Sequence, residues 1–430
     1  MKNKFIKSTL ILLVGGLLTK VLGMVIRITM SRLMSTDGIG VYMLLIPTFS
    51  LLIAISQFGF PTSISKLVAE NKRNNRRLVF SVLPISIILN IMIMFLCLFF
   101  GNFIAVNLIH EKRAILGLKC IGFVLPFISI SSILRGYFFG REKMFPHVIS
   151  NVIEDLVRLL SLIIGIPIFM KYGIEKAVMF VVMSNIISEF TSIVVLIFFL
   201  PKKISIGDLC PKKSYIKDVM SLSVPTTASR IIGNIGYFFE PIIFTSILLH
   251  SGFRNSFIVH EYGVISGYVM PLLLLPSFFT NAISQAVIPV ISNSYVNRKY
   301  KYLVSKIKQA ITFSLLIGIP TTILFLLFPG FFLHLIYNNI EGVKYLRFLS
   351  IFFLLFYIET PIQASLQAMG FSVETMRCTI FGVIIKLITL TLFTYLFGIW
   401  GLLISSAINI LFVTLYSLSI LKKKTNCLLL

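Results

Sequence analysis

Two apolar segments of this chain carry a cation within the same short phrase. The run from Thr19 to Gly23 (TKVLG) recurs from Ser229 to Gly233 (SRIIG), so Lys20 and Arg230 take matching places. A cation in the middle of a bilayer costs roughly 2.5 to 3.5 kcal/mol on insertion scales, and a repeated one therefore suggests a function. Such cations suit phosphate, which Arg binds in bidentate fashion and Lys binds as a point charge.

Arg27 lies two helical turns after Lys20, so a helix would place both cations on one face with Gly23 between them. Together with Arg230 they would suit an anionic group such as a diphosphate in a central cavity. The alternative is that each cation only pairs with an acid and holds helices together. The acids within apolar segments are Glu154, Asp155, Glu189, Glu240 and Glu359.

A second phrase is also repeated. Ser56-Gln57, with a proline at Pro61, returns as Ser284-Gln285 with a proline at Pro289, and a basic stretch follows each copy. The two repeats predict two similar halves. We expect Gln57 and Gln285 to belong to the same substrate site as the cations.

One possible ion pair is visible in the sequence. Glu154 and Arg158 stand at i and i+4, so they could neutralise each other on one helix, with Asp155 facing elsewhere. This spacing is compatible with a structural pair and with an ion-coupling site.

Prolines interrupt two apolar segments beside acids. Glu240 is followed by Pro241, and Glu359 precedes Pro361. A proline frees backbone carbonyls and kinks a helix, which suits a gating hinge or a cation site, although such kinks also occur without a role. We treat Pro241 and Pro361 as candidate hinges and Glu240 as a candidate coupling acid.

The segments that must position these residues are helices across a membrane. Hydrophobic residues make up 57% of the 430 residues and charged residues only 13%. About 20 apolar residues span a bilayer as a helix, and the ~10-residue alternation of a membrane barrel is missing. Twelve spans are predicted, at residues 6–32, 38–65, 79–106, 114–139, 148–170, 174–199, 218–248, 262–291, 303–334, 342–369, 375–397 and 398–421.

The net charge of +24 does not indicate nucleic-acid binding, because the cations cluster in alternate connections between spans. Basic residues precede the first span, follow the second, sixth and eighth, and close the chain at Lys422 to Lys424. By the positive-inside rule we expect both termini of this multi-pass membrane protein to be cytoplasmic.

The repeats and the basic connection together define the expected domains. These are an N-terminal six-helix lobe at residues 1–200, a cytoplasmic linker at 201–217, a C-terminal six-helix lobe at 218–421 and a cytoplasmic tail at 422–430. Six helices separate the copies, so the lobes should be parallel and related by an axis along the membrane normal.

Catalytic and cofactor chemistry find no support in the sequence. The five histidines are scattered, the five cysteines have no metal spacing, and no Gly-rich nucleotide loop is present. We therefore expect no catalytic residue, no metal site and no cofactor. Transport would draw on Na⁺ or H⁺ coupling, the membrane potential or substrate supply.

The residues also resemble a known family, the polysaccharide exporter branch of the multidrug/oligosaccharidyl-lipid/polysaccharide (MATE-like) superfamily, including its sporulation proteins. The resemblance covers most of the chain. It rests on Thr19 to Gly23, Arg27, Gly38 to Tyr42, Pro47, Pro61, Ile64 to Glu70, Gly136 to Gly140, Met144, Pro146, Ser150 to Arg158, Val224 to Arg230, Tyr237 to Pro241, Gly267 to Pro276 and Ile283 to Pro289.

The resemblance implies a place in a bacterial plasma membrane. It also implies export or flipping of an undecaprenyl-linked cell-wall precursor, lipid II or a related lipid-linked sugar, for the spore cortex of a sporulating cell. Relatives look like MurJ-type lipid II flippases, in which cavity cations meet the diphosphate, a role that Lys20, Arg27 and Arg230 would take here. Partners would be the lipid-linked oligosaccharide, membrane lipids and cell-wall synthesis enzymes. Two alternatives stay open: a MATE-type cation-coupled drug exporter, and a membrane assembly factor for cortex synthesis that transports nothing.

The charge asymmetry yields a test of topology. In a cysteine-free background, a cysteine introduced at Asn75 or Lys213 should be shielded from a membrane-impermeant thiol reagent, and one at Gly252 should react. Labelling of the Lys213→Cys protein from outside intact cells would overturn the twelve-span arrangement.

Overall fold

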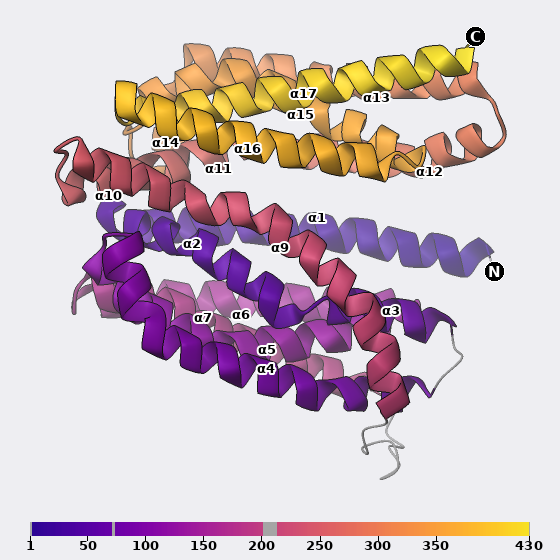
Figure 1. The fold of residues 1–430 in the computed structure, drawn as a ribbon, viewed down its shortest axis with the longest axis horizontal. Coiled ribbons are helices and arrows are strands. Elements are labelled where there is room, and N and C mark those ends of the chain that lie inside the picture. Colours follow the sequence, from indigo (N-terminus) through magenta and orange to yellow (C-terminus); the bar gives the residue numbers. More distant parts are fainter. Residues whose placement is uncertain (1, 71–73, 201–212, 430) are drawn as a thin grey trace. The chain divides into compact units, whose positions relative to one another are not determined.

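A computed structural model describes residues 2–70, 74–200 and 213–429 of the chain, and its elements are helices (Figure 1). Helices are expected in an apolar chain, because they satisfy their own backbone hydrogen bonds in hydrocarbon. By internal contacts the chain divides into two compact units, Met1–Pro241 and Ile242–Leu430.

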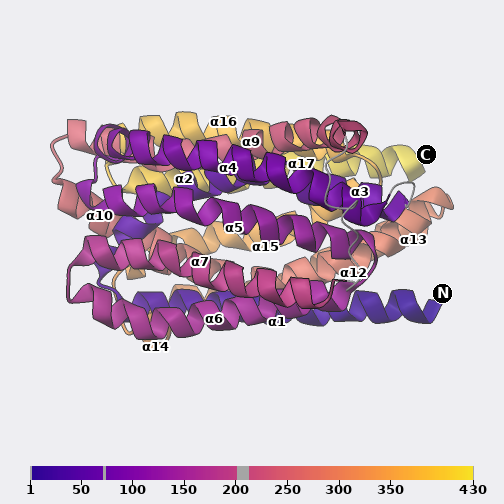
Figure 2. The same cartoon turned by 90° about the horizontal axis from the view of Figure 1, so that it is seen from below.

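Among the described residues, the first unit contains seven α-helices, two short turns and the larger part of an eighth α-helix, α9. Its elements are α1 (Lys2–Leu33), α2 (Thr36–Gln57), α3 (Phe60–Glu70), α4 (Asn75–Phe103), a π-helical turn (Ile104–Leu108), a 3₁₀ turn (Lys112–Ala114), α5 (Ile115–Gly140), α6 (Met144–Met170), α7 (Ile174–Phe198) and α9 (Lys213–His250). Helix α5 packs against both α4 and α7, as Figure 2 shows, and α1 packs on α6.

The second unit begins within α9 and continues through shorter helices before its long ones. Its elements are α10 (Asn255–Gly263), a π-helical turn (Val264–Val269), α11 (Met270–Leu274), α12 (Ser277–Val296), α13 (Tyr300–Leu327), α14 (Pro329–Tyr337), α15 (Val343–Ala368), α16 (Ser372–Phe397) and α17 (Trp400–Leu429). Tyr357 of α15 donates a hydrogen bond to the Leu273 carbonyl at 2.7 Å, which ties α15 to α11.

Each predicted span coincides with one helix or with consecutive helical segments, and the chain is an all-helical, multi-pass membrane protein. By length and hydropathy eleven segments of the described residues qualify as spans. The predicted span at 148–170 corresponds to α6. This helix is not among the eleven, because Glu154, Asp155 and Arg158 in its middle make it too highly charged. The predicted span at 38–65 is divided into α2 and α3 by Phe58 and Gly59, both in the left-handed backbone region with φ of 43° and 61°.

The first half of α9 packs with the first unit. Tyr215 and Val219 of α9 join a buried cluster that includes Phe60 and Ile64 of α3. The Ser223 hydroxyl donates to the Ser63 hydroxyl at 2.9 Å. The sequence analysis began the C-terminal lobe at residue 218, whereas the boundary between the compact units follows Pro241. The compact units follow from packing, and the start of α9 packs with the first unit. Most of the predicted linker, residues 201–212, lies outside the described residues.

Small residues allow α5 and α3 to approach closely. A Cβ atom built on Gly136 would lie 2.5 Å from the carbonyl oxygen of Pro61, and one on Gly140 would lie 2.4 Å from that of Ser65. The Gly136-x-x-x-Gly140 spacing therefore lies at a contact between helices.

Polar side chains form a buried connection between α2, α4 and α5. The Ser56 hydroxyl donates to Asn90 Oδ1 at 2.5 Å, and the Asn90 amide donates to the Ser86 carbonyl at 2.7 Å. Ser129 of α5 closes the group through the Ser86 hydroxyl at 2.6 Å. In hydrocarbon, interhelical hydrogen bonds of this kind fix which helices pack together.

The stretch predicted to be a C-terminal tail is helical through residue 429. Helix α17 continues past the predicted end of the last span, and Lys424 lies 3.8 Å from Glu374 at the start of α16. Lys424 also lies 4.4 Å from the centre of the Phe371 ring. These contacts hold the stretch against its own unit.

The close approach of α5 and α3 can be tested with a matched pair of glycine substitutions. Gly136→Ala should lower the free energy of unfolding by about 1–3 kcal/mol, because the new methyl group meets backbone that cannot yield. Gly23→Ala should be neutral or stabilise by up to about 1 kcal/mol, because no described atom lies within 4 Å of the new methyl group and Ala favours helix. Membrane abundance and thermal unfolding in detergent are measured for both variants. Equal losses of stability in Gly136→Ala and Gly23→Ala would contradict the close contact at Gly136.

Candidate functional site

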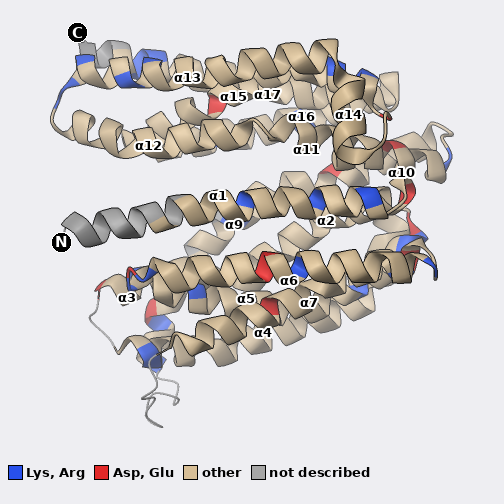
Figure 3. Ribbon diagram, turned by 180° about the vertical axis from the view of Figure 1, so that it is seen from behind, with Lys and Arg blue, Asp and Glu red and all other residues tan. Residues whose placement is uncertain are grey.

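The cations of α1 lie on a face that other helices leave open. Residues 16, 20, 23 and 27 fall on one side of the helix, and Gly15 falls on another, where its added Cβ would meet the Val148 side chain of α6. The side chains of Lys20 and Arg27 are exposed. A Cβ built on Gly16 or Gly23 meets no described atom within 4 Å. Figure 3 shows blue residues within the length of α1, well inside its ends.

Arg230 stands in a similar environment on α9. Its side chain is half-buried, and a Cβ built on Gly233, three residues later, meets no described atom within 4 Å. Because α9 belongs to the first unit as far as Pro241, Lys20, Arg27 and Arg230 all lie in one compact unit. The sequence analysis had divided them between two lobes.

Side chains from α1, α2 and α9 converge near Tyr237. Arg27 of α1, Tyr42 of α2 and Glu240 of α9 all lie within electrostatic range of the Tyr237 hydroxyl. Glu240 is buried, with 6% of its surface exposed, whereas Arg27 is exposed. One candidate cation and one candidate coupling acid therefore occur in the same neighbourhood.

In both copies of the Ser-Gln phrase the serine is buried and the glutamine is more exposed. Ser56 belongs to the buried group with Asn90, and Ser284 donates to the Thr280 carbonyl of its own helix at 2.7 Å. Gln57, the last residue of α2, is half-buried, and Gln285 of α12 is exposed. The serines therefore stabilise the fold, and only the glutamines remain candidates for substrate contact, each in a different unit.

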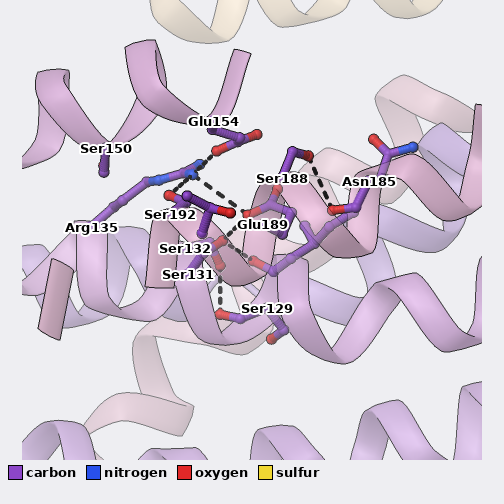
Figure 4. A network of polar contacts seen from close by, with 12 residues as sticks. Ser129, Ser131, Ser132, Arg135, Ser150, Glu154, Asn185, Ser188, Glu189 and Ser192 are labelled. Carbon is purple, nitrogen blue, oxygen red and sulfur yellow. Dashed lines mark hydrogen bonds and ion pairs between the residues drawn. The ribbon is translucent and has the colours of Figure 1, made fainter. Parts of the chain in front are cut away.

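A polar network missed by the sequence analysis lies between α5, α6 and α7 (Figure 4). The guanidinium of Arg135 pairs with Glu154 and lies 3.5 Å from Glu189, and it donates to the Ser192 hydroxyl at 2.7 Å. Ser131 donates to the same Glu189 oxygen at 2.5 Å. One cation thus faces carboxylates from two neighbouring helices.

The predicted pair between Glu154 and Arg158 is replaced by the pair with Arg135. An exposed i, i+4 pair contributes only about 0.2–0.5 kcal/mol. Arg135 instead reaches Glu154, Glu189 and Ser192 at once from a third helix, so more of the buried polar groups find partners. The signal for Arg135 was present in the sequence, because it is a cation within the apolar segment 114–139.

The candidate hinges lie in unbroken helices. Helix α9 runs through Pro241, and the boundary between the two compact units falls directly after this residue. Helix α15 runs through Pro361. Near it, Glu359 accepts a hydrogen bond from Gln363 at 2.9 Å and a longer one from Thr414 of α17 at 3.4 Å.

Comparison with known proteins relates most of the chain to membrane transporters. Residues 5–295 match the family model for polysaccharide biosynthesis proteins, and residues 241–392 match the MatE model. Stage V sporulation protein B of Bacillus subtilis is 34% identical over 397 residues, which cover 90% of this chain and 77% of that protein.

Solved structures share the fold at low sequence identity. An inward-facing multidrug resistance MATE transporter superposes with a TM-score of 0.77 at 17% identity, over 95% of each chain. The lipid II flippase MurJ in an inward closed conformation superposes with a TM-score of 0.73 at 16% identity, over 95% of this chain and 87% of that one. The fold is therefore that of MATE and MurJ proteins.

The network around Arg135 can be tested for a structural role. Arg135→Met should destabilise the protein by about 3–5 kcal/mol, because it leaves two carboxylates without their cation. Adding Glu154→Gln and Glu189→Gln should restore much of the lost stability. Lys171→Met, which removes an exposed cation directly after α6, is the matched control and should change unfolding in detergent little. Full stability with lost transport in Arg135→Met would instead make the network part of the transport mechanism.

Proposed function

The chain belongs to the polysaccharide biosynthesis protein family of MATE-like membrane transporters, and from this premise we propose that it flips an undecaprenyl-linked cell-wall precursor across the membrane. The substrate is lipid II or a related lipid-linked sugar, and its destination is the spore cortex. The protein is a transporter and not an enzyme.

One observation carries the proposal: the cations of α1 face open space. Lys20 and Arg27 share the unpacked side of the helix with Gly16 and Gly23, and Arg230 lies in the same unit. Exposed cations within a membrane span suit an anionic ligand such as a diphosphate.

The nature of the relatives supports the proposed substrate. A sporulation protein shares 34% of the aligned residues, and a lipid II flippase shares the fold. Such a substrate joins an anionic diphosphate to a long apolar tail, so the polar head would meet the cations while the tail stays in the lipid. Gln57 and Gln285 are proposed to contact the head, as donors and acceptors for the sugar.

We propose alternating access as the mode of transport. The repeated halves would move relative to each other by bending at Pro241 and Pro361. The position of Pro241 at the boundary between the compact units supports it as a hinge. Both termini are proposed to be cytoplasmic, in the membranes of the sporulating cell, because basic residues precede the first span and close the chain.

A cation-coupled drug exporter is the second candidate, and two observations favour it. Residues 241–392 match the MatE model, and Glu240 is a buried acid beside Tyr237. In that case Glu240 would bind Na⁺ or H⁺, and Glu240→Gln would abolish transport of a lipophilic cation. An assembly factor that transports nothing would leave cortex formation dependent on the protein while reconstituted vesicles showed no flipping.

The cation set gives a direct test. Arg230→Ala should lower transport roughly 10- to 150-fold, the effect of losing about 1.5–3 kcal/mol of charge-assisted contact, while membrane abundance stays normal. Lys20→Arg should be tolerated because the charge is kept. Arg27→Ala should be harmful to a lesser degree, because Arg27 lies nearer the end of its span. Lys308→Ala, an exposed cation on α13, is the matched control and should have no effect.

Cortex formation, flipping in vesicles and membrane abundance are measured together for this set. A helix-holding role would lower the abundance of Arg230→Ala and be rescued by neutralising an acid. Wild-type flipping by well-folded Arg230→Ala protein would refute the cationic site.

A further inference from the structure

The first unit contains an apolar cavity that none of the candidate substrate residues lines. It lies between α4, α5 and α7, has a volume of about 220 Å³, and eight of its ten lining residues are Val, Leu, Ile or Phe. The two polar members are Arg76 and Tyr137. Figure 2 shows these three helices running side by side.

The cavity starts at one end of all three helices and runs inward. On α4 it is lined from Arg76, the second residue of the helix, to Leu83, which is seven residues or about 10 Å further along. On the neighbouring helices it is lined by the last turns, as far as Tyr137 of α5 and Leu200 just after α7. One end therefore lies at a membrane surface, and the other lies within the hydrocarbon layer.

Cations gather at the surface end. Arg76 lines the cavity itself, and Arg141 donates a hydrogen bond to the Tyr137 hydroxyl at 3.2 Å. Arg77 follows Arg76, but it does not line the cavity. The lining itself is apolar, and the arginines Arg76 and Arg141 lie at its surface end. This combination matches a molecule that has an apolar chain and an anionic phosphate head.

We infer that this cavity binds one acyl chain of an anionic glycerophospholipid such as phosphatidylglycerol, with the lipid phosphate at Arg76. Arg recognises phosphate in bidentate fashion, and basic pockets between membrane helices bind anionic lipid head groups. The volume is smaller than the roughly 300–1,000 Å³ of sites for drug-sized ligands, so it suits a segment of one chain. The inferred site is separate from the cations of α1 and α9 and does not depend on the proposed substrate.

Lipid binding to the purified, delipidated full-length protein tests the inference by native mass spectrometry. The probes are phosphatidylglycerol and phosphatidylcholine with identical acyl chains, together with undecaprenyl phosphate. We expect one phosphatidylglycerol molecule to bind roughly tenfold or more tightly than phosphatidylcholine, because the choline cation of phosphatidylcholine offsets the charge of its phosphate and is repelled by the arginines. Arg76→Ala should remove this preference, and Arg77→Ala, the adjacent control, should retain it.

A second pair of variants tests the cavity itself. Ile130→Trp should fill it and abolish the tight phosphatidylglycerol adduct, whereas Ile187→Trp, an exposed α7 position outside the cavity, should not. If Ile130→Trp fails to fold, the Arg76 and Arg77 pair still decides the matter. Equal binding of the two phospholipids, equal losses in both arginine variants, or tighter binding of undecaprenyl phosphate would each overturn the inference.

Discussion

The cost of placing a charge in hydrocarbon is the constraint on which this structure depends. Each ionised side chain within a span needs an opposite charge or an open face. Arg135 meets this need with carboxylates from α6 and α7, and so joins three helices of the first unit. Lys20 and Arg27 lie on the side of α1 that faces open space, and the opposite side packs on α6. These exposed side chains of α1 are accessible to an anionic ligand.

Packing around small and polar residues sets the framework that carries those cations. Gly136 and Gly140 let α5 touch the backbone of α3, and the Ser56–Asn90 group joins α2 to α4 and α5. The same α3 receives the start of α9 through Ser63. Because of this contact, Arg230 lies in the same compact unit as the cations of α1, although it is 210 residues away from Lys20 in the sequence.

Features with a local cause were predictable from the sequence. The twelve spans follow from runs of apolar residues, and each corresponds to described helices. Features set by tertiary packing were not predictable in this way. The partner of Glu154 is a residue 19 positions earlier on another helix, and i, i+4 spacing on one helix cannot reveal it. The boundary between the compact units after Pro241 likewise depends on the packing of α9 against α3. No sequence pattern marks that packing. Most residues of the apolar cavity are ordinary Leu, Ile and Val, so only their arrangement in space distinguishes them.

We propose that Lys20, Arg27 and Arg230 of the first unit bind the diphosphate of a lipid-linked sugar during its movement across the membrane. The most direct measurement is flipping by the purified protein in vesicles, using a fluorescent lipid-linked sugar and an analogue with the same tail and sugar but no diphosphate. Loss of fluorescence to a membrane-impermeant quencher reports the rate. The account predicts rapid flipping of the diphosphate lipid and none of the analogue above protein-free vesicles. Equal flipping of both lipids, or of neither, would contradict it.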